Sequence, residues 1–538
     1  MSDTSLRRNI TVSAVLGLLL LPGCQAVDTA LTDTEAIGFA SVALPEQHTR
    51  TVSVEAEHST VSYRYPVLGQ AHPLTIHTRT AMAQRQTAFL EESPGGSDPK
   101  LTQDVELLGS SEHVTGLRLK VHDSTAEQTD SSSTLWYDAH TDQVLPWTSL
   151  FKNEQALGQA HLDLAEVLRS EYDLTAEELP GLLGEIAARA EAPESGQGEA
   201  AASPTPEQKI EADSAETVLN GPDTDDTDVI QDTDDLDETV DLDETERLWK
   251  NAESWDDSPL ADLAFSTAGG LAVRMAPEHI PDAEPGDEIL VPIAPEVIEP
   301  HLSELGHQAR DAAVDSHDSP EPLIVDPDVT DPGVTLECQR LKCVALTFDD
   351  GPGEHTDELL DHLAEYDAKA TFYVLGSLVK EFPEIVERTA TEGHEVANHT
   401  WAHADLTGLS AEGVRKDLER TDKAIEQVTG RLPVTMRPPY GSLNDTVREA
   451  SPHPLVLWDV DTMDWRNRDT KAITRHALKE SKPGSVVLFH DIHKTSVDAL
   501  PEILEGLHRQ GYHFVTVEEM FGLQGLPAGE ILTDARID

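Results

Sequence analysis

Hydrophobic and polar positions follow two different patterns along the chain. In the first part, runs such as 51–56 and 117–121 alternate hydrophobic and polar residues with a period of two, which indicates strands that are buried on one face. Apolar residues at helical spacing follow at 153–172. These elements predict an α+β accessory domain over residues 42–307, in which we find no metal-binding or nucleophilic cluster.

The pattern is lost within this first part, at residues 192–247. Gly, Pro, Ser and Glu dominate this segment, and an acidic run that repeats Asp-Leu-Asp-Glu-Thr follows. Such a composition cannot offset the entropy of ordering, so we predict a disordered insertion. Two later hydrophobic runs, 271–274 and 289–293, are too few to make a domain, and we expect them to complete the earlier sheet. Residues 308–337, rich in Asp and Pro, are a predicted linker.

A second pattern covers residues 338–523, where hydrophobic runs alternate with helical patterns. Seven strand–helix units of this kind predict an α/β fold with a parallel sheet, most simply a closed (β/α)7 barrel. Active sites of such barrels lie at the carboxyl ends of the strands. Residues 524–538 are a predicted C-terminal tail. The strands are expected at 344–349, 370–375, 394–399, 434–437, 455–460, 485–490 and 513–517.

The chain is strongly acidic. It contains 38 Lys and Arg against 101 Asp and Glu, a formal net charge of -63. Residues 223–246 hold thirteen of the acidic residues, but without them 88 still stand against 38 basic ones, so the excess is chain-wide. Phosphate binding needs clustered basic residues, so the balance argues against a nucleic-acid partner.

The first residues resemble an export signal. Arg7 and Arg8 precede an apolar run, Ile10–Leu21, and then Cys24. The run is shorter than the roughly 18 residues that span a bilayer, and its basic start is typical of a secretory signal. We predict a signal peptide over 1–24 with a lipoprotein-type box, lipidation at Cys24, and an exported protein held by a lipid anchor at the outer face of the membrane. Plain secretion with an incidental cysteine and a twin-arginine signal stay open.

The other two cysteines are close together, just before the first predicted barrel strand. Cys338 and Cys343 have no second Cys/His pair nearby, which argues against a metal site. In an oxidising compartment we expect them to form a disulfide, which would contribute roughly 2 kcal/mol in the chain-entropy model.

Two of the predicted strand ends carry candidate metal ligands. The strand at 344–349 delivers Asp349 and Asp350 into a Gly-Pro turn, where two adjacent carboxylates repel unless a metal ion or a shared proton relieves them. The next candidate is His399-x-x-x-His403, whose histidines lie on one face of a helical turn. Alone this motif is more often a surface helix. Beside the aspartates it predicts a divalent-metal site with two His, one carboxylate and an open position.

Three later strand ends carry acid–base candidates. Segment 437–441 combines an arginine that can grip a carboxylate with a turn whose backbone N–H groups can face an oxyanion. Segments 461–465 and 488–491 supply carboxylates and His490, a candidate general acid whose pKa a carboxylate partner would raise. Each of these taken singly also has a purely structural interpretation.

Together, five segments resemble in order and spacing the five motifs of the polysaccharide deacetylases, the NodB-like family also called carbohydrate esterase family 4. The resemblance covers about a third of the chain and implies a distorted (β/α)7 barrel. Within the family, the chain resembles bacterial peptidoglycan N-acetylglucosamine deacetylases. The order of features in the first domain also resembles the accessory domain of some secreted bacterial deacetylases. The five segments are Thr347–Pro352, His399–His403, Arg437–Tyr440, Asp461–Trp465 and Leu488–His490.

The family's roles can be carried over by position. The resemblance implies that Asp350, His399 and His403 bind a divalent metal, usually Zn2+. It implies that Asp349 is the general base, and that Arg437 orients it.

The resemblance also assigns the remaining positions. The backbone N–H of Tyr440 would help to form the oxyanion hole, and His490 would be the general acid, tuned by Asp464. The acetyl-methyl pocket would be lined by Trp465, Leu488 and Pro439.

These roles predict hydrolysis of an acetamide by a water that the metal activates, releasing acetate. For an exported protein the accessible polymer is peptidoglycan, and we predict its N-acetylglucosamine as the substrate; no protein partner is indicated. Alternatives are removal of O-acetyl groups from a xylan-type polymer and deacetylation of chitin or chitooligosaccharides. Two histidines and a carboxylate also define the facial triad of iron oxygenases. A surface binding or sensing protein that acts through residues 42–307 is the alternative of another class.

Overall fold

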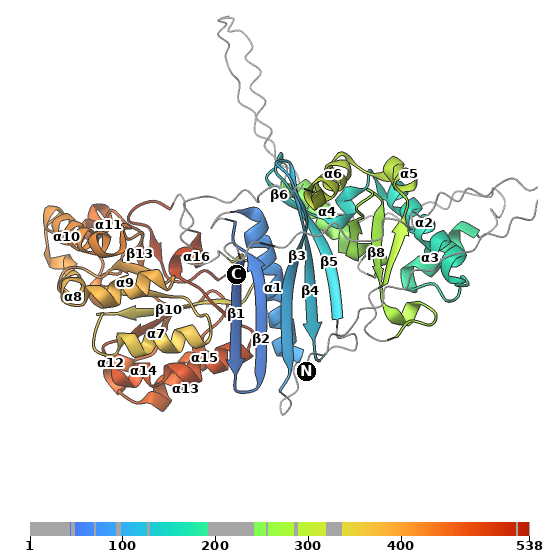
Figure 1. Cartoon of the computed structure of the whole chain (residues 1–538). Helices are drawn as coiled ribbons and strands as arrows, with labels where there is room; N and C mark the ends of the chain where they lie inside the picture. The colour runs from blue at the N-terminus through green and yellow to red at the C-terminus, as the bar shows by residue number, and fades with distance from the viewer. Residues whose placement is uncertain are drawn as a thin grey trace, which may run out of the picture.

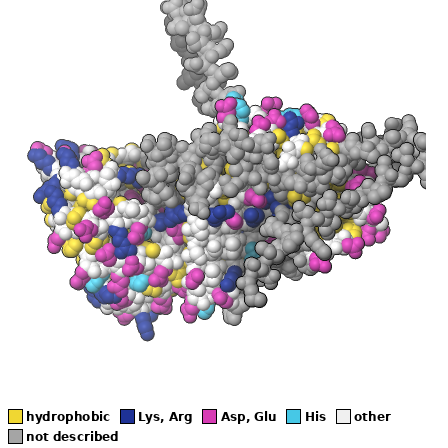
Figure 2. All heavy atoms as spheres, viewed as in Figure 1, with side chains coloured by type: hydrophobic (Ala, Val, Ile, Leu, Met, Phe, Trp, Pro, Cys, Tyr) yellow, Lys and Arg dark blue, Asp and Glu magenta, His cyan; other side chains and the backbone are white. Residues whose placement is uncertain are grey.

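The computed structural model describes most of the chain outside its first residues and its acidic segment. The predicted signal peptide with Cys24, and most of the predicted insertion, lie outside the described residues. None of the described helices is both long and apolar enough to cross a membrane. Acidic side chains are spread over the visible face of the described parts (Figure 2), in keeping with the composition. The described residues are 44, 49–68, 72–92, 98–125, 130–191, 242–253, 255, 257–284, 289–318, 336–522 and 526–536.

The first part is built on a six-stranded sheet in the order β1-β2-β3-β4-β5-β6 (Figure 1). All neighbours are antiparallel except β2 and β3, which are parallel and joined by helix α1 (Pro73–Glu92). The predicted alternation of buried and exposed residues is present in β1. It is wrong for 117–121 in β4, where Leu117 and Arg118 are both buried and the next three residues are all half-buried. The strands are β1 (Thr49–Ala56), β2 (Ser59–Pro66), β3 (Lys100–Ser110), β4 (Val114–Asp123), β5 (Asp130–Asp138) and β6 (Gln143–Pro146).

Helix α1 is buried on both sides. Leu74 and Met82 pack into the core of the six-stranded sheet, whereas Ala83 belongs to a cluster with residues of the second part of the chain. On that second side, Thr87 Oγ1 lies 2.9 Å from His513 Nε2. A surface helix has one polar face toward solvent. In α1 several threonines are buried instead, because the helix is covered on two sides. The six-stranded sheet and the second part of the chain share this helix.

A second sheet contradicts one prediction. β7 (Leu263–Phe265), β8 (Leu271–Met275) and β9 (Ile289–Ile293) form a separate three-stranded antiparallel sheet. The prediction that 271–274 and 289–293 complete the earlier sheet is therefore wrong. β8 is almost fully buried, so it needs cover on both faces, which an edge position in the first sheet would not give. The two sheets do share a core, in which Trp136 and Phe265 lie edge to face.

The helices of the first part also shift two predicted boundaries. α6 (Glu304–Asp318) extends into the predicted linker 308–337, because Ala309, Ala312 and Ala313 pack against the first sheet at helical spacing. α4 begins inside the predicted insertion 192–247. The other helices are α2 (Glu154–Tyr172), α3 (Gly181–Glu191), α4 (Leu242–Glu253) and α5 (Pro295–Ile298).

The second part is the predicted α/β unit. Its parallel sheet has the order β12-β11-β10-β15-β14, and β16 pairs with β10 off this path. Its strands are β10 (Cys343–Asp349), β11 (Ala370–Val374), β12 (Glu395–Asn398), β13 (Leu455–Val456), β14 (Val460–Asp461), β15 (Val486–His490), β16 (His513–Phe514) and β17 (Ile531–Leu532).

Helices surround this sheet. They are α7 (Thr356–Glu365), α8 (Gly376–Glu381), α9 (Pro383–Thr391), α10 (Ala411–Thr429), α11 (Asp445–Ala450), α12 (Asp464–Asn467), α13 (Thr470–Glu480), α14 (Lys494–Val497), α15 (Leu500–Arg509) and α16 (Val517–Phe521). Short 3-10 turns across the chain are η2 (Trp147–Leu150), η3 (Pro259–Asp262), η4 (Pro277–His279), η5 (Glu299–His301), η6 (Leu406–Gly408) and η7 (Pro439–Gly441).

Three predicted elements of the barrel differ from the structure. No strand forms at 434–437, where only Met436 makes bridges, to Asn398 and Leu455; the flanking prolines lack the N–H that a ladder needs. The predicted strand 455–460 is divided into β13 and β14. Residues 524–538 are more than a tail, because β17 pairs with β13.

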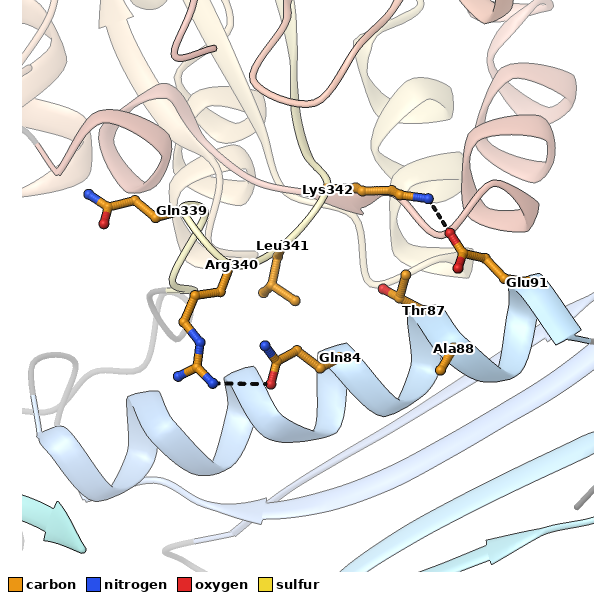
Figure 3. Close-up of a pocket in the computed structure, with 8 residues that line it drawn as sticks. All are labelled: Gln84, Thr87, Ala88, Glu91, Gln339, Arg340, Leu341 and Lys342. Atoms are coloured by element: carbon orange, nitrogen blue, oxygen red, sulfur yellow. Dashed lines mark hydrogen bonds and ion pairs between the residues drawn. The ribbon is translucent and has the colours of Figure 1, made fainter. Parts of the chain in front are cut away.

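The loop before β10 contacts α1. Cys338 and Cys343 form a disulfide, and residues 339–342 face α1 across a surface pocket of about 450 Å³ (Figure 3). Across it, Arg340 reaches Gln84, and Lys342 pairs with a glutamate of α1. This pocket lies at the amino end of β10, whereas the candidate catalytic aspartates follow its carboxyl end.

Candidate active site

The carboxyl ends of three parallel strands bring the predicted site residues together. β10 ends at Asp349 and is followed by Asp350, β12 is followed by His399, and β15 ends at His490. In the β10–β15 pairing, Asp349 lies directly beside His490. The parallel register therefore places the predicted base and the predicted acid on adjacent strands.

The metal-ligand atoms form a compact triad. Asp350 Oδ1 lies 3.5 Å from His399 Nε2 and 3.3 Å from His403 Nε2, and all three ligand atoms lie within 4.8 Å of one another. Ligands bonded at about 2.0–2.1 Å in a tetrahedral site are about 3.4 Å apart. Asp350 Oδ1 is also buried without a hydrogen-bond partner, which a cation would supply. The residues therefore fit a divalent metal.

The surroundings prepare these ligands for a metal. His399 Nδ1 lies 2.7 Å from the backbone oxygen of Arg437, so Nδ1–H donates and the lone pair of Nε2 faces Asp350. Burial, only partly opposed by the Asp350 carboxylate, lowers the pKa of His403 and favours its neutral, metal-binding form. Burial alone would raise the pKa of Asp350, but the nearby imidazoles outweigh it and lower that pKa. The carboxylate form is thereby favoured.

Strained backbone marks the same loops. Asp350, His403 and Tyr440 have φ angles of 73°, 59° and 61°, in the left-handed region that residues other than glycine rarely adopt. Such strain persists only where the surrounding structure holds it, and it is concentrated at functional sites. Two of these residues, Asp350 and His403, are candidate metal ligands.

Arg437 is locked in a fully buried position. Its Nη1 donates to Asp349 Oδ1 at 2.8 Å and to Thr347 Oγ1 at 2.7 Å. Its Nε and Nη2 donate to the backbone oxygens of Val456 and Leu457. The guanidinium also lies over the ring of Tyr373, 4.2 Å from its centroid. The arginine is thus held from several sides.

This arginine fixes the orientation of Asp349. One carboxylate oxygen, Oδ1, is held by Arg437. The other, Oδ2, lies 3.7 Å from His399 Nε2 and so faces the triad. Asp349 can therefore accept a proton from a group at the triad while Arg437 balances its charge.

Asp464 holds His490 in place. Asp464 Oδ1 lies 2.8 Å from His490 Nδ1, and Oδ2 accepts from the His490 backbone N–H at 2.7 Å and from Ser496 Oγ at 2.6 Å. Burial opposes protonation of His490, but the hydrogen bond and charge of Asp464, with the charges of Asp349 and Asp350, raise its pKa to about 9. The imidazolium form is favoured at neutral pH, as a proton donor requires.

The predicted acetyl pocket residues differ in exposure. Trp465 is 49% exposed. Tyr440, which is predicted to act through its backbone N–H and not as part of this pocket, is 69% exposed and packs edge-on against His403. Leu488 and Pro439 are buried. Leu488 precedes His490 by two residues and therefore lies on the same face of β15. That these side chains form one acetyl pocket stays a prediction.

The structure adds positioning contacts by residues to which the motifs assigned no role. Thr347, Tyr373 and Ser496 contact the catalytic pairs as described above. Asp491 accepts from Thr356 Oγ1 at 2.5 Å, and a Cβ on Gly351 would lie 2.2 Å from its carboxylate, so a glycine is required there. Asp491 could be considered from the sequence because it follows His490. The other contacts join segments that are far apart along the chain, so no local sequence pattern predicts them.

Comparison with known proteins agrees with this geometry. The family model described as polysaccharide deacetylase matches residues 337–453. A peptidoglycan-N-acetylglucosamine deacetylase of Bacillus cereus is 39% identical over 189 residues, which cover 33% of this chain and 88% of that protein. The chain belongs to the polysaccharide deacetylase family. The relatives matched here are named as deacetylases of peptidoglycan.

Two longer members of the polysaccharide deacetylase family match the same part. Peptidoglycan-N-acetylglucosamine deacetylase PgdA of Listeria monocytogenes is 45% identical over 182 residues, and peptidoglycan-N-acetylmuramic acid deacetylase PdaC of Bacillus subtilis is 44% identical over 180 residues. These matches cover 34% and 33% of this chain, and only 39% and 38% of the two relatives. The rest of the chain is outside this similarity.

The Asp464–His490 pair gives the candidate active site a testable pH dependence. A general acid must be protonated, so activity falls as pH rises through the pKa of His490. Replacing Asp464 with Asn removes the carboxylate that raises this pKa. We expect the alkaline limb of the kcat–pH profile to move to lower pH by about one unit or more.

The measurement is acetate release as a function of pH, with both proteins carrying the same metal, because a dication at the triad itself lowers the pKa of nearby groups. Asp461→Asn is the control, since Asp461 accepts from Met463 N and no hydrogen bond to His490 is seen among the described residues. An alkaline limb that stays in place in Asp464→Asn would contradict the assigned role of the pair.

Proposed function

We propose that the protein removes N-acetyl groups from N-acetylglucosamine residues of peptidoglycan and releases acetate. The observation that carries this proposal is the combination at one mouth of the Asp350–His399–His403 triad, a carboxylate held by Arg437 and a histidine held by Asp464. Hydrolysis of an amide needs a base that takes a proton from the attacking water and an acid that gives a proton to the leaving amine. Three relatives are named as peptidoglycan deacetylases, which supports a wall polymer as the substrate.

We propose Zn2+ as the metal. Two imidazoles and one carboxylate with an open position are the ligands of catalytic zinc sites. When bound there, the metal would supply Lewis-acid polarisation of the attacking water and of the acetyl carbonyl. Iron oxygenases share this ligand set, but the Asp349–Arg437 and His490–Asp464 pairs are suited to proton transfer, which favours hydrolysis.

The chain's own residues divide the proton transfers. Asp349 Oδ2, which faces the triad, takes the proton of the attacking water, while Arg437 keeps the carboxylate in place. His490 gives a proton to the amine nitrogen as the carbon–nitrogen bond breaks, and Asp464 holds its imidazole. The backbone N–H of Tyr440 is proposed to bind the oxyanion. Water and acetamide are thereby converted to acetate and a free amino sugar.

Loss of the metal is expected to abolish activity. Dialysis against a chelator should lower acetate release to background, and added Zn2+ should restore it. His403→Ala removes one of the three metal ligands, and we expect the variant protein to bind zinc at least tenfold more weakly than the wild type. Zinc content by mass spectrometry and acetate release are measured together.

The matched control is His58→Ala, which removes an exposed histidine in the turn before β2. It should retain full zinc content. Activity that persists in the chelated protein, or zinc content that is unchanged in His403→Ala, would contradict the metal assignment.

Three substrates test the proposed polymer. Acetate release is compared for peptidoglycan fragments, a chitooligosaccharide and O-acetylated xylan, and mass spectrometry of the digested fragments identifies the deacetylated sugar. We expect the highest kcat/KM on peptidoglycan, with glucosamine as the product. A higher value on xylan would favour the O-acetyl alternative, and product found only on muramic acid would change the sugar.

We propose in addition that the protein is exported and lipid-anchored at Cys24. A disulfide such as Cys338–Cys343 persists in oxidising compartments, which supports export. Metabolic labelling with a radioactive fatty acid tests the anchor. Label that remains after Cys24→Ala would contradict it.

A further inference from the structure

Helices α12 and α13 reverse the charge balance of the chain. Segment 466–482 contains two acidic residues, Asp469 and Glu480, and six basic ones, whereas the whole chain has 101 acidic and 38 basic residues. We call the six the basic stripe. They are Arg466, Arg468, Lys471, Arg475, Lys479 and Lys482.

Three residues of the basic stripe form one exposed line along α13. Lys471, Arg475 and Lys479 recur every four residues and therefore share a face of α13, whose opposite face is buried at Ile473 and Ala477. These eight residue steps extend over about 12 Å of helix. All six side chains are exposed. Figure 2 shows basic side chains at the lower left of the molecule, where Figure 1 places α12 and α13.

The charges of the stripe are largely unneutralised. Among the described residues, only Lys479 of the stripe has an ion pair, with Glu480. Helix α10 differs, since Lys416 pairs with Glu412 and Lys423 with Glu419 one turn away. Carboxylates are abundant in this chain and could have neutralised these side chains. Solubility alone therefore does not explain why most of the stripe has no ion pair within the described part of the chain.

The stripe begins at the mouth of the active site. α12 starts with Asp464, which holds His490, and continues with the exposed Trp465. Arg466 and Arg468 follow directly. A polymer whose acetylated sugar enters the site can therefore meet Arg466 and Arg468 beside the mouth, and α13 extends the charge away from it.

We propose that the basic stripe binds carboxylate groups of the polymer being deacetylated, namely the acidic peptides that peptidoglycan carries beside its sugars. This inference rests on the proposed function and makes the stripe a determinant of specificity for acidic over neutral glycans. A single exposed ion pair contributes little, but aligned charges raise the local concentration of a polyanion. Elsewhere the net charge of -63 repels such a polymer.

The test neutralises the stripe and compares two substrates. The variant Lys471→Gln/Arg475→Gln/Lys479→Gln is assayed on peptidoglycan oligomers with acidic peptides and on an uncharged N-acetylglucosamine oligomer. We expect kcat/KM on the acidic oligomers to fall about tenfold at about 20 mM salt, through KM, and to change less than about twofold on the neutral one. The difference should shrink at about 0.5 M salt, where charges are screened.

The matched control neutralises three exposed residues of α10, as Arg415→Gln/Lys416→Gln/Lys423→Gln, and should change neither substrate. The single variant Arg475→Gln, with a smaller salt-dependent loss, covers the case in which the triple variant does not fold. Equal losses on both substrates, or no loss on the acidic one, would overturn the role of the stripe. Wild-type protein that releases acetate only from the neutral oligomer would overturn the peptidoglycan assignment and this inference together.

Discussion

Asp349→Asn is expected to lower kcat by a factor of about 10² to 10⁴, the range for loss of a general acid–base group, and to leave zinc content unchanged. An amide cannot accept the proton of the attacking water, yet its oxygen can still accept the hydrogen bond from Arg437 that orients Asp349. The triad of Asp350, His399 and His403 keeps all its ligand atoms. Steady-state acetate release and metal analysis on the same preparation provide the measurement.

The control for this variant is Asp405→Asn. Asp405 lies on the loop after His403, is exposed, and caps η6 through Thr407 N, a contact that asparagine can also make. It should therefore keep full activity. If Asp349→Asn released acetate at the wild-type rate, the division of labour between Asp349 and Asp350 would be wrong.

Arg437→Leu is expected to lower the free energy of unfolding by about 3–5 kcal/mol, because removing one partner leaves the other charge of a buried pair uncompensated. Asp349 would lose its cation, and the carbonyls of Val456 and Leu457 would lose their donors. The rate of acetate release should fall as well, because Arg437 no longer orients Asp349. Urea unfolding of the full chain and acetate release are measured in parallel.

Two further arginine variants sharpen this prediction. Arg437→Lys keeps the charge but cannot reach all the acceptors at once, so an intermediate loss is expected. Arg431→Leu removes an arginine that is 60% exposed and pairs with Glu518 at the surface, where a loss below about 1 kcal/mol is expected. A similar loss in Arg431→Leu and Arg437→Leu would mean that burial of the pair is not the cause.

Much of the candidate site could be predicted because each motif lies at the end of a parallel strand. Residues at strand ends meet at one edge of the sheet whatever the register, so Asp350 and His399 needed no knowledge of the loops between them. The secondary structure at 434–437 and the sheet to which β7 to β9 belong were harder to predict from the sequence. A short apolar run indicates burial but does not show which sheet it joins, or whether it forms a strand at all.

The positioning residues could not be predicted for a different reason. Tyr373 lies within an apolar strand and Ser496 within a short helix, and both have the appearance of ordinary core positions. Ser496 lies 32 residues from its partner Asp464. Only the packed fold brings such contacts together.

Helix α1 determines which end of the parallel strands faces the first sheet. α1 contacts the amino ends of the parallel strands, near Cys343 and His513, and the catalytic mouth is at their carboxyl ends. β10 separates the two by about 20 Å, the length of its seven residues. Through α1, the first sheet therefore packs against the end of the parallel strands that lies opposite the catalytic mouth.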